Sequence, residues 1–309
     1  MSTSGASGDS RPLVAMVLPG GEGFSPAVVG AIGLIVHRLA GVPGPFRSVV
    51  LGQAGSAVPF PDRAFAPVQA WPLPHLGARA RYPGAVLRAL RRLRPALVEV
   101  HNRPVIALML AARLAETKVV LVLHNDPQSM RSAHTAAERS RLLRRLAGVV
   151  AVSEWVRGRL LDGVPGPPPI PVDVLSNCID LAALPPGLPA AAREPLILFA
   201  GRTIVEKGAD LFVRACAEAL PALPGWGAVM LGARGHNPED DAIGYVAAGP
   251  TPEQAGVRML GYQPHPAVLA RMGRAAIVLM PSRWEEPFGL TALEALAMGA
   301  ALICSRRGG

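Results

Sequence analysis

Short segments made almost entirely of apolar residues alternate along this chain with longer segments whose apolar residues recur at helical spacing. This alternation constrains the fold more than any other feature, because strands that alternate with helices are typical of βαβ units and a parallel sheet. The near absence of polar residues from the strand segments also favours parallel sheets, which helices cover on both faces. The sequence therefore predicts an α/β fold with strands at residues 13–18, 48–51, 96–100, 119–123, 149–152, 172–175, 196–200, 229–231, 258–260, 276–280 and 301–304. The predicted helices are residues 27–40, 83–93, 105–115, 135–146, 154–161, 210–220, 265–272 and 288–298.

Two proline-rich stretches, residues 163–171 and 184–195, interrupt the alternation. Proline has no amide hydrogen to donate, so neither stretch is expected to form regular structure. A chain of 309 residues is long enough for two domains of about 100–200 residues each. We therefore predict two Rossmann-like, doubly wound domains, residues 1–185 and 186–309, that face each other across a cleft. Such sheets bind ligands at the carboxyl ends of their strands, so this cleft is the expected site.

The formal charge of the chain is +9, and its basic residues are nearly all arginine. Many of them gather in two segments, one with Arg79, Arg81, Arg88, Arg91, Arg92 and Arg94, and one with Arg139, Arg141, Arg144 and Arg145. Two interpretations stay open: a surface for an anionic membrane, or solvated helix faces in a chain with an arginine bias. Aromatic residues make up only 5% of the chain and no nucleic-acid recognition motif is present, so we expect no nucleic-acid partner.

The targeting features of the sequence are few. No apolar stretch reaches the ~18–20 residues that span a bilayer, and the apolar run at residues 13–18 lacks the flanks of a signal peptide. The three cysteines have the spacing of neither a zinc site nor a disulfide framework. We therefore expect a cytoplasmic protein whose membrane contact, if it has one, is peripheral and at the inner face.

The segment PSRWEEPFGLTALEA at residues 281–295 places a predicted helix start just after a strand. Unpaired backbone amides at a helix start bind anions, so a phosphate is expected to meet the first residues of this helix. These residues are Phe288, Gly289, Leu290 and Thr291. Glu286 precedes the helix and Glu294 lies about two turns into it, where carboxylates could accept hydrogen bonds from sugar hydroxyls. Taken alone, the two glutamates could equally be a helix cap and a solvent-facing residue.

Three further groups of residues follow predicted strands. Arg202 and Lys207 flank a loop after the strand at 196–200, and two cations suit a diphosphate where no metal is used, although a surface ion pair is the alternative. Gly20 and Gly21 form a turn that lacks the third glycine of a dinucleotide fingerprint. His101 and His124 end two successive strands; a lone histidine there is usually structural, but two of them in one cleft favour a site.

These segments resemble glycosyltransferase family 4, the large family of retaining enzymes with the GT-B fold. Glu286 and Glu294 match its Glu-x7-Glu motif, which implies contacts with the donor sugar and the ribose hydroxyls, respectively. Arg202 and Lys207 match its GRxxxxKG signature, which implies that they bind the pyrophosphate of the donor and stabilise its departure. The resemblance extends over nearly the whole chain and is most specific from residue 196 onward.

The same resemblance implies roles for other residues. His124 matches the family histidine that contacts the donor sugar, and Gly20 and Gly21 match a glycine-rich loop that approaches the donor phosphate and the acceptor. Members of the family usually continue past the position of Gly309 with further βα units and a final helix, so we expect the second domain to be incomplete. The pattern is similar to members that build bacterial cell-surface polysaccharide or lipopolysaccharide.

We therefore hypothesise a hexosyltransferase that moves a sugar from a nucleoside diphosphate sugar to a saccharide or lipid-linked acceptor, with retention of configuration. No carboxylate cluster suggests a metal site, so we expect neither metal nor cofactor. Two alternatives use the same architecture: a nucleotide-sugar epimerase, and a non-catalytic protein that binds sugar nucleotides. A dinucleotide-dependent oxidoreductase is disfavoured by the missing third glycine.

Overall fold

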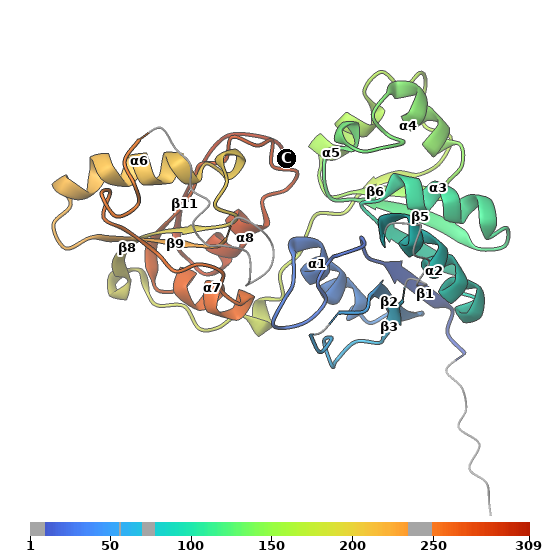
Figure 1. Cartoon of the computed structure of the whole chain (residues 1–309), viewed down its shortest axis with the longest axis horizontal. Coiled ribbons are helices and arrows are strands. Elements are labelled where there is room, and N and C mark those ends of the chain that lie inside the picture. Colours follow the sequence, from blue (N-terminus) through green and yellow to red (C-terminus); the bar gives the residue numbers. More distant parts are fainter. Residues whose placement is uncertain (1–9, 56, 70–77, 234–248) are drawn as a thin grey trace, which may run out of the picture.

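Two parallel β-sheets organise the chain (Figure 1). The computed structural model describes residues 10–55, 57–69, 78–233 and 249–309, with the backbone alone described at 78–80. The first sheet has seven strands in the order β3-β2-β1-β4-β5-β6-β7, namely β1 Leu13–Val17, β2 Arg47–Gln53, β3 Phe65–Val68, β4 Leu97–His101, β5 Lys118–Leu123, β6 Gly148–Ala151 and β7 Val172–Val174. The second has five strands in the order β10-β9-β8-β11-β12, namely β8 Glu194–Ala200, β9 Gly227–Leu231, β10 Val257–Met259, β11 Ala275–Met280 and β12 Ala301–Cys304. The predicted fold class is confirmed.

In each sheet the chain order reverses beside one central strand. β1 lies between β2 and β4, and β8 lies between β9 and β11. At such a point the loops that leave two neighbouring strands turn to opposite sides, which opens a crevice beyond their carboxyl ends. The loops after β1, β4, β8 and β11 hold most of the residues that the sequence analysis identified as a site.

Helices cover both faces of each sheet, as the apolar strands require (Figure 1). They are α1 Ala31–Ala40, α2 Ala78–Leu93, α3 Pro104–Arg113, α4 Ala136–Leu143, α5 Glu154–Leu161, α6 Ala209–Ala219, α7 His265–Met272 and α8 Leu290–Ala297. Thr135 and Glu138 form a capping box at the start of α4. The Oγ of Ser153 accepts a hydrogen bond from the amide of Val156 at the start of α5.

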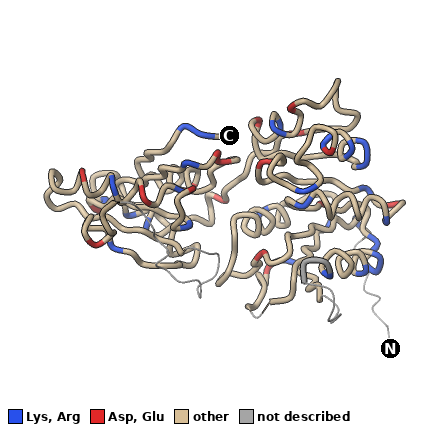
Figure 2. The backbone as a smooth tube through the Cα atoms, turned by 45° about the horizontal axis from the view of Figure 1, so that its top comes forward, with Lys and Arg blue, Asp and Glu red and all other residues tan. Residues whose placement is uncertain are grey.

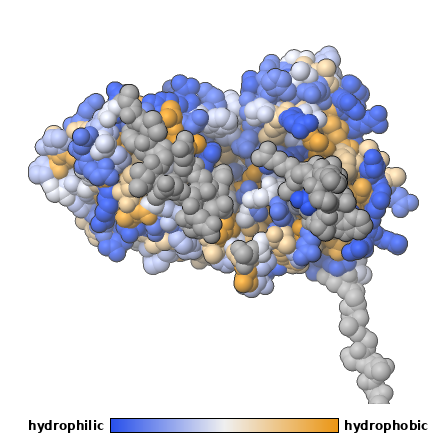
Figure 3. Space-filling model, in the orientation of Figure 1, coloured by the Kyte–Doolittle hydropathy of each residue, from blue (hydrophilic) through white to orange (hydrophobic). Residues whose placement is uncertain are grey.

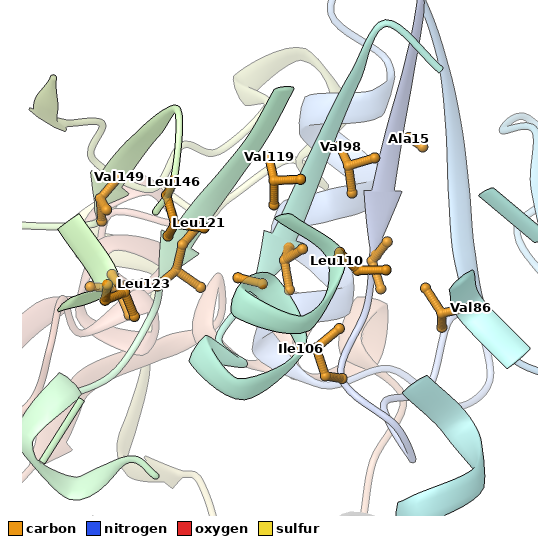
Figure 4. Close-up of a cluster of buried hydrophobic side chains, with 14 of the residues drawn as sticks. Ala15, Val86, Val98, Ile106, Leu110, Val119, Leu121, Leu123, Leu146 and Val149 are labelled. Atoms are coloured by element: carbon orange, nitrogen blue, oxygen red, sulfur yellow. The ribbon is translucent and has the colours of Figure 1, made fainter. Parts of the chain in front are cut away.

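The largest core lies between the first sheet and helices α2, α3, α4 and α5. Figure 4 shows Val98, Leu110 and Leu121 among its side chains, and all three are fully buried. Burying one such side chain contributes about 1.5–3 kcal/mol, so this layer is the main support for the strand ends that reach the site. In the second sheet, α6 packs on one face through Phe212, while α7 and α8 pack on the other.

Ser25 before Pro26 has the sequence pattern of a helix N-cap, but the first helix begins at Ala31 and not at the predicted residue 27. The Oγ of Ser25 instead accepts a hydrogen bond from the amide of Val28 at 3.0 Å, which closes a turn before the helix. A serine that caps a turn has the same sequence pattern as one that caps a helix. Gly30 is the N-cap, with no side-chain hydrogen bond.

Other elements also differ from the prediction. Helix α2 begins at Ala78 and carries Pro83 near its start, whereas the prediction used Pro83 as the first residue. Helix α8 begins at Leu290, after the predicted residue 288. Strand β3 was not predicted; it contains Pro67, which the edge of a sheet tolerates. The polar segment at residues 235–253, for which the sequence predicts a long loop, lies mostly outside the described residues.

The two sheets are joined by the segment between β7 and β8, and the predicted boundary at residue 185 falls within it. Side chains also cross between the two halves of the chain. The contacts are Ser153 Oγ to the carbonyl of Pro287 (2.5 Å), Tyr262 Oη to the carbonyl of Ala27 (3.3 Å), and the Arg38 guanidinium to the Glu294 carboxylate (3.4 Å). The halves therefore meet on the side of their strand ends.

The arginine-rich segments have different surroundings. Figure 2 shows Lys and Arg positions along α2 and around α4, and Figure 3 shows hydrophilic residues over much of the outer surface of both halves. Arg91, Arg92 and Arg94 are exposed. Arg139 is buried and donates to backbone carbonyls, one of them that of Leu160 at 2.9 Å, so it is a structural residue and not part of a surface. None of the helices in the described ranges is long and apolar enough to cross a membrane.

Candidate active site

A cavity of about 360 Å³ lies between the two sheets and collects most of the predicted donor-binding residues. His124 reaches it from the end of β5, Arg202 and Lys207 from the loop after β8, and Glu286 from the loop after β11. The start of α8 forms another part of its wall, through Phe288, Gly289, Leu290 and Thr291. Residues far apart in the sequence thus meet in one place, as the two-domain hypothesis requires.

Lys207 and Glu286 form an ion pair inside this cavity. The Nζ of Lys207 lies 2.6 Å from Oε1 of Glu286, and the Oγ of Ser282 donates to the same oxygen at 2.8 Å. The lysine side chain is 28% exposed and the glutamate side chain only 11% exposed. An unpaired carboxylate at that depth is costly, and the lysine supplies its counter-charge. An anion with more charge than one carboxylate can therefore compete for the ammonium.

The loop after β8 packs tightly against the loop after β11. The amides of Arg283 and Trp284 both donate to the carbonyl of Glu206 at 2.9 Å. Gly208 follows the 3-10 turn Val205–Lys207 with φ +72°, and a Cβ there would overlap the carbonyl oxygen of Pro281. Only glycine fits this left-handed position, and its contact with the backbone holds Lys207 beside Glu286.

The start of α8 presents backbone amides to the cavity. Gly289 is its N-cap, with φ +82°. Its carbonyl accepts from the amides of Ala292 and Leu293, so the amides of Leu290 and Thr291 come before the first intrahelical donors. These amides and the positive end of the helix dipole attract an anion. The exposed side chain of Arg202 lines the same space and has no carboxylate partner among the described residues.

His124 and His101 form a hydrogen-bonded pair at the ends of β5 and β4. The Nδ1 of His101 and the Nε2 of His124 are 3.0 Å apart. Burial lowers the pKa of His124 to about 4, and burial together with the neighbouring His124 lowers the pKa of His101 well below its ordinary value. Both rings are therefore neutral near pH 7, and the second nitrogen of His124 is the one left for the cavity.

A second cavity of about 210 Å³ adjoins the first and shares Arg202, Leu290 and Thr291 with it. Glu294 lies in its wall and is 5% exposed. Its Oε1 accepts from Nε2 of His265 at 2.7 Å and pairs with Arg38 of α1 at 3.4 Å. Glu294 thus lines the cavity that adjoins the cavity of Glu286, and its carboxylate contacts residues of both halves of the protein.

A third cavity, of about 800 Å³, lies within the first half of the chain beside the glycine-rich turn. Gly21 and Glu22 line it, together with the rings of Phe24, Phe60 and Phe65. Burial raises the pKa of Glu22, although a hydrogen bond from the amide of Gly33 and the charge of Arg103 oppose this. The cavity therefore combines aromatic surface with a carboxyl group that protonates more readily than usual.

The structure brings together Glu286, His124, Arg202, Lys207 and the start of α8, and it places Glu294 in the adjoining cavity. Gly20 and Gly21 are not among the residues that line the first cavity: Gly20 packs against the ring of Tyr82, and Gly21 lines the third cavity. The roles of all these residues stay predictions.

Among the lining residues that sequence reasoning did not assign to the site are Asn125, Asn177, Trp284 and His265. Asn125 carried a signal, since it follows His124 at a strand end. No local pattern distinguishes Asn177 or His265, because each is placed by packing between distant segments. In the ranges that the structure describes, no cluster of three His, Cys, Asp or Glu side chains could hold a metal ion.

Comparisons with known proteins agree with this geometry. Residues 103–309 match the family model described as "Family 4 Glycosyltransferase in conflict systems", and residues 14–178 match "Glycosyl transferase 4-like domain". The Bacillus subtilis (strain 168) protein YtcC, named as a glycosyltransferase, is 26% identical over 247 residues, which are 75% of this chain and 60% of that protein. The chain thus spans less than two thirds of the length of this relative.

Solved structures share the fold. Sucrose-phosphate synthase from Thermosynechococcus elongatus superposes with a TM-score of 0.72 at 18% identity, over 97% of this chain and 82% of that one. Anabaena HepE, solved in complex with UDP-glucose, gives a TM-score of 0.67 at 17% identity, over 96% and 81% of the two chains. This likeness bears out the GT-B arrangement of two Rossmann-like domains. Because the family models match the segments that build both sheets and the cavity between them, the chain belongs to glycosyltransferase family 4.

Proposed function

We propose that this protein transfers a hexose-type sugar from a nucleoside diphosphate sugar to a saccharide or lipid-linked acceptor, with retention of configuration and without a metal ion. One observation carries the proposal: Arg202, Lys207 and the start of α8 line the same cavity. A departing diphosphate develops negative charge, and preorganised cations and amides stabilise such charge most where water is scarce. The UDP-glucose bound to the related fold of HepE supports a nucleotide-sugar donor.

The two adjoining cavities suit the two ends of such a donor. We place the sugar beside His124 and Glu286 in the larger cavity, and the nucleoside beside Glu294 in the smaller one. Arg202 and Thr291 line both cavities, so the diphosphate would lie at their junction. A ribose hydroxyl that donates to Glu294 would replace the long contact from Arg38.

The reaction then needs little from the protein beyond positioning and electrostatics. We infer an oxocarbenium-like transition state, as in other reactions at the anomeric carbon. The leaving phosphate accepts the proton of the acceptor hydroxyl, while Lys207 and Arg202 balance its charge. We place the acceptor in the third cavity, whose aromatic rings suit a sugar face or a lipid-linked group.

Calorimetric titration with UDP-, GDP- and ADP-sugars tests the donor. We expect one nucleotide sugar to bind with a dissociation constant in the range of about 1 μM to 1 mM that is typical of enzyme substrates. Product analysis with and without added saccharide or lipid-linked acceptors then distinguishes a transferase from an epimerase and from a binding protein. An epimerase would convert the donor with no acceptor, and a binding protein would leave it intact. Absence of binding by every nucleotide sugar in the panel would sink the proposal.

We also propose that the protein works in the cytoplasm, at the inner face of the membrane and toward cell-surface polysaccharide or lipopolysaccharide, with the exposed arginines of α2 against anionic lipid. Each arginine near such a surface contributes about 1 kcal/mol, so Arg91→Gln/Arg92→Gln should weaken binding to phosphatidylserine vesicles about thirtyfold. Arg258→Gln/Arg306→Gln removes the same charge from exposed positions of the second half and is the matched control. Equal losses in the two double variants, or none in either, in a vesicle sedimentation assay would refute a role for α2.

A further inference from the structure

We propose that Glu99 and His101 are positioning residues that set the tautomer of His124, and so decide whether His124 accepts or donates a hydrogen bond in the donor cavity. The inference deepens the proposed function, because it assumes that a donor sugar occupies this cavity. It rests on a chain of three polar side chains that starts at Glu99 on β4 and ends at the cavity wall.

The geometry of the chain is continuous. The Oε2 of Glu99 lies 3.7 Å from Nε2 of His101, and Nδ1 of His101 lies 3.0 Å from Nε2 of His124. His101 is fully buried, and its Nε2 has no hydrogen-bond partner among the described residues; the Glu99 carboxyl group, at 3.7 Å, is the charged group that lies beside it. A buried polar atom without a hydrogen bond is rare, so the charge of the neighbouring Glu99 is the main electrostatic influence on whether Nε2 carries the proton.

A neutral imidazole carries one N–H, and burial keeps both histidines neutral near pH 7. When Glu99 is ionised, its charge favours the proton on Nε2 of His101. Nδ1 of His101 then accepts, so Nε2 of His124 donates to it. Nδ1 of His124 is left as an acceptor, which suits a sugar hydroxyl that donates.

When Glu99 is protonated, each histidine carries its proton on the other ring nitrogen. Without the negative charge of Glu99, the proton of His101 is no longer held on Nε2, so it can sit on Nδ1 and be donated to Nε2 of His124. Nδ1 of His124 now carries the hydrogen, so the nitrogen that is not bonded to His101 becomes a donor. Each ring gains and loses one proton, so the net charge of the pair is unchanged.

The surroundings of Glu99 leave the carboxyl group free to control this chain. The strands on either side of β4 place Met16 and Val120 beside it, and neither side chain titrates. On α1, which packs over Met16, the charged groups are His37 and Arg38. His37 pairs with Asp62, and Arg38 pairs with Glu294, so both are engaged elsewhere. Burial raises the pKa of Glu99 to about 7, which places its titration in an accessible range.

The experiment follows the histidine ring nitrogens by ¹⁵N NMR in the intact, ligand-free protein, at about pH 6 and about pH 8, on either side of the pKa of Glu99. His124 should carry its hydrogen on Nε2 at the higher pH and on Nδ1 at the lower pH. In Glu99→Gln, which keeps the shape but does not titrate, the tautomer should be the same at both pH values. Glu116→Gln, a change at an exposed glutamate, should behave as the wild type.

A tautomer of His124 that is identical at both pH values in the wild-type protein overturns the proposal, and this result needs no variant that has to fold. A pH change that persists unaltered in Glu99→Gln overturns it as well. Since no donor is present, neither outcome depends on the proposed function. In a second arm, donor affinity should change about three- to tenfold between the two pH values in the wild type and stay constant in Glu99→Gln, as one hydrogen bond would give. If no nucleotide sugar binds at all, the proposed function fails while the tautomer result stands.

Discussion

Replacing Lys207 with alanine is expected to weaken donor binding more than about a hundredfold. One charge-assisted hydrogen bond to a phosphate is worth about 1.5–3 kcal/mol, which alone gives about 10- to 150-fold. The substitution also leaves Glu286 without its counter-charge at a position that is 11% exposed, facing the incoming diphosphate. Both effects lower affinity. Calorimetry with the nucleotide sugar that binds the wild-type protein measures the loss.

Lys118→Ala is the matched control, since Lys118 is the only other lysine of the chain and lies exposed at the start of β5. It should leave affinity unchanged. The double variant Lys207→Ala/Glu286→Gln removes the repulsion and should recover part of the affinity, although it also loses any contact of Glu286 with the sugar. A Lys207→Ala protein that binds donor as the wild type does would falsify the diphosphate site.

Gly208→Ala is expected to destabilise the second half of the protein by about 4 kcal/mol. A left-handed backbone costs a non-glycine residue about 1–3 kcal/mol, and forcing a methyl group into packed atoms adds about 1–3 kcal/mol. The added Cβ would overlap the carbonyl of Pro281, a backbone atom that cannot rotate away. Urea unfolding followed by circular dichroism measures the change.

The variant Gly21→Ala distinguishes the strain of a left-handed backbone from the steric overlap with Pro281. Gly21 has φ +84°, and an added Cβ meets nothing within 4 Å, so only the backbone strain of about 1–2 kcal/mol should appear. Equal losses in the two variants would mean that the contact with Pro281 contributes nothing. Because Gly208 directly follows Lys207, its alanine variant should also bind donor more weakly where it still folds.

The strands could be predicted because they are apolar on both faces, a pattern that a buried parallel sheet imposes on every residue. Helix starts were less predictable, since Ser25 caps a turn with the same chemistry that would cap a helix. Strand β3 was missed because it is short and contains Pro67. Local sequence therefore predicts the elements well where burial dictates composition, and poorly where one side chain decides a boundary.

The candidate site divides in a similar way. Lys207, Arg202, Glu286 and His124 follow strand ends, and the topology of a doubly wound sheet brings such positions together. The contact between Arg38 and Glu294 joins residues on α1 and α8, and no spacing in the sequence predicts it. The chain of polar contacts from Glu99 through His101 to His124 likewise depends on the register of β4 with β5.

The ion pair of Lys207 with Glu286 has a consequence for turnover. Under the proposed function, the diphosphate of the donor would displace the Glu286 carboxylate from the Lys207 ammonium as it binds. After the proposed transfer, Glu286 would compete with the nucleoside diphosphate product for the same ammonium. The carboxylate that slows entry slightly should thus hasten release of the product.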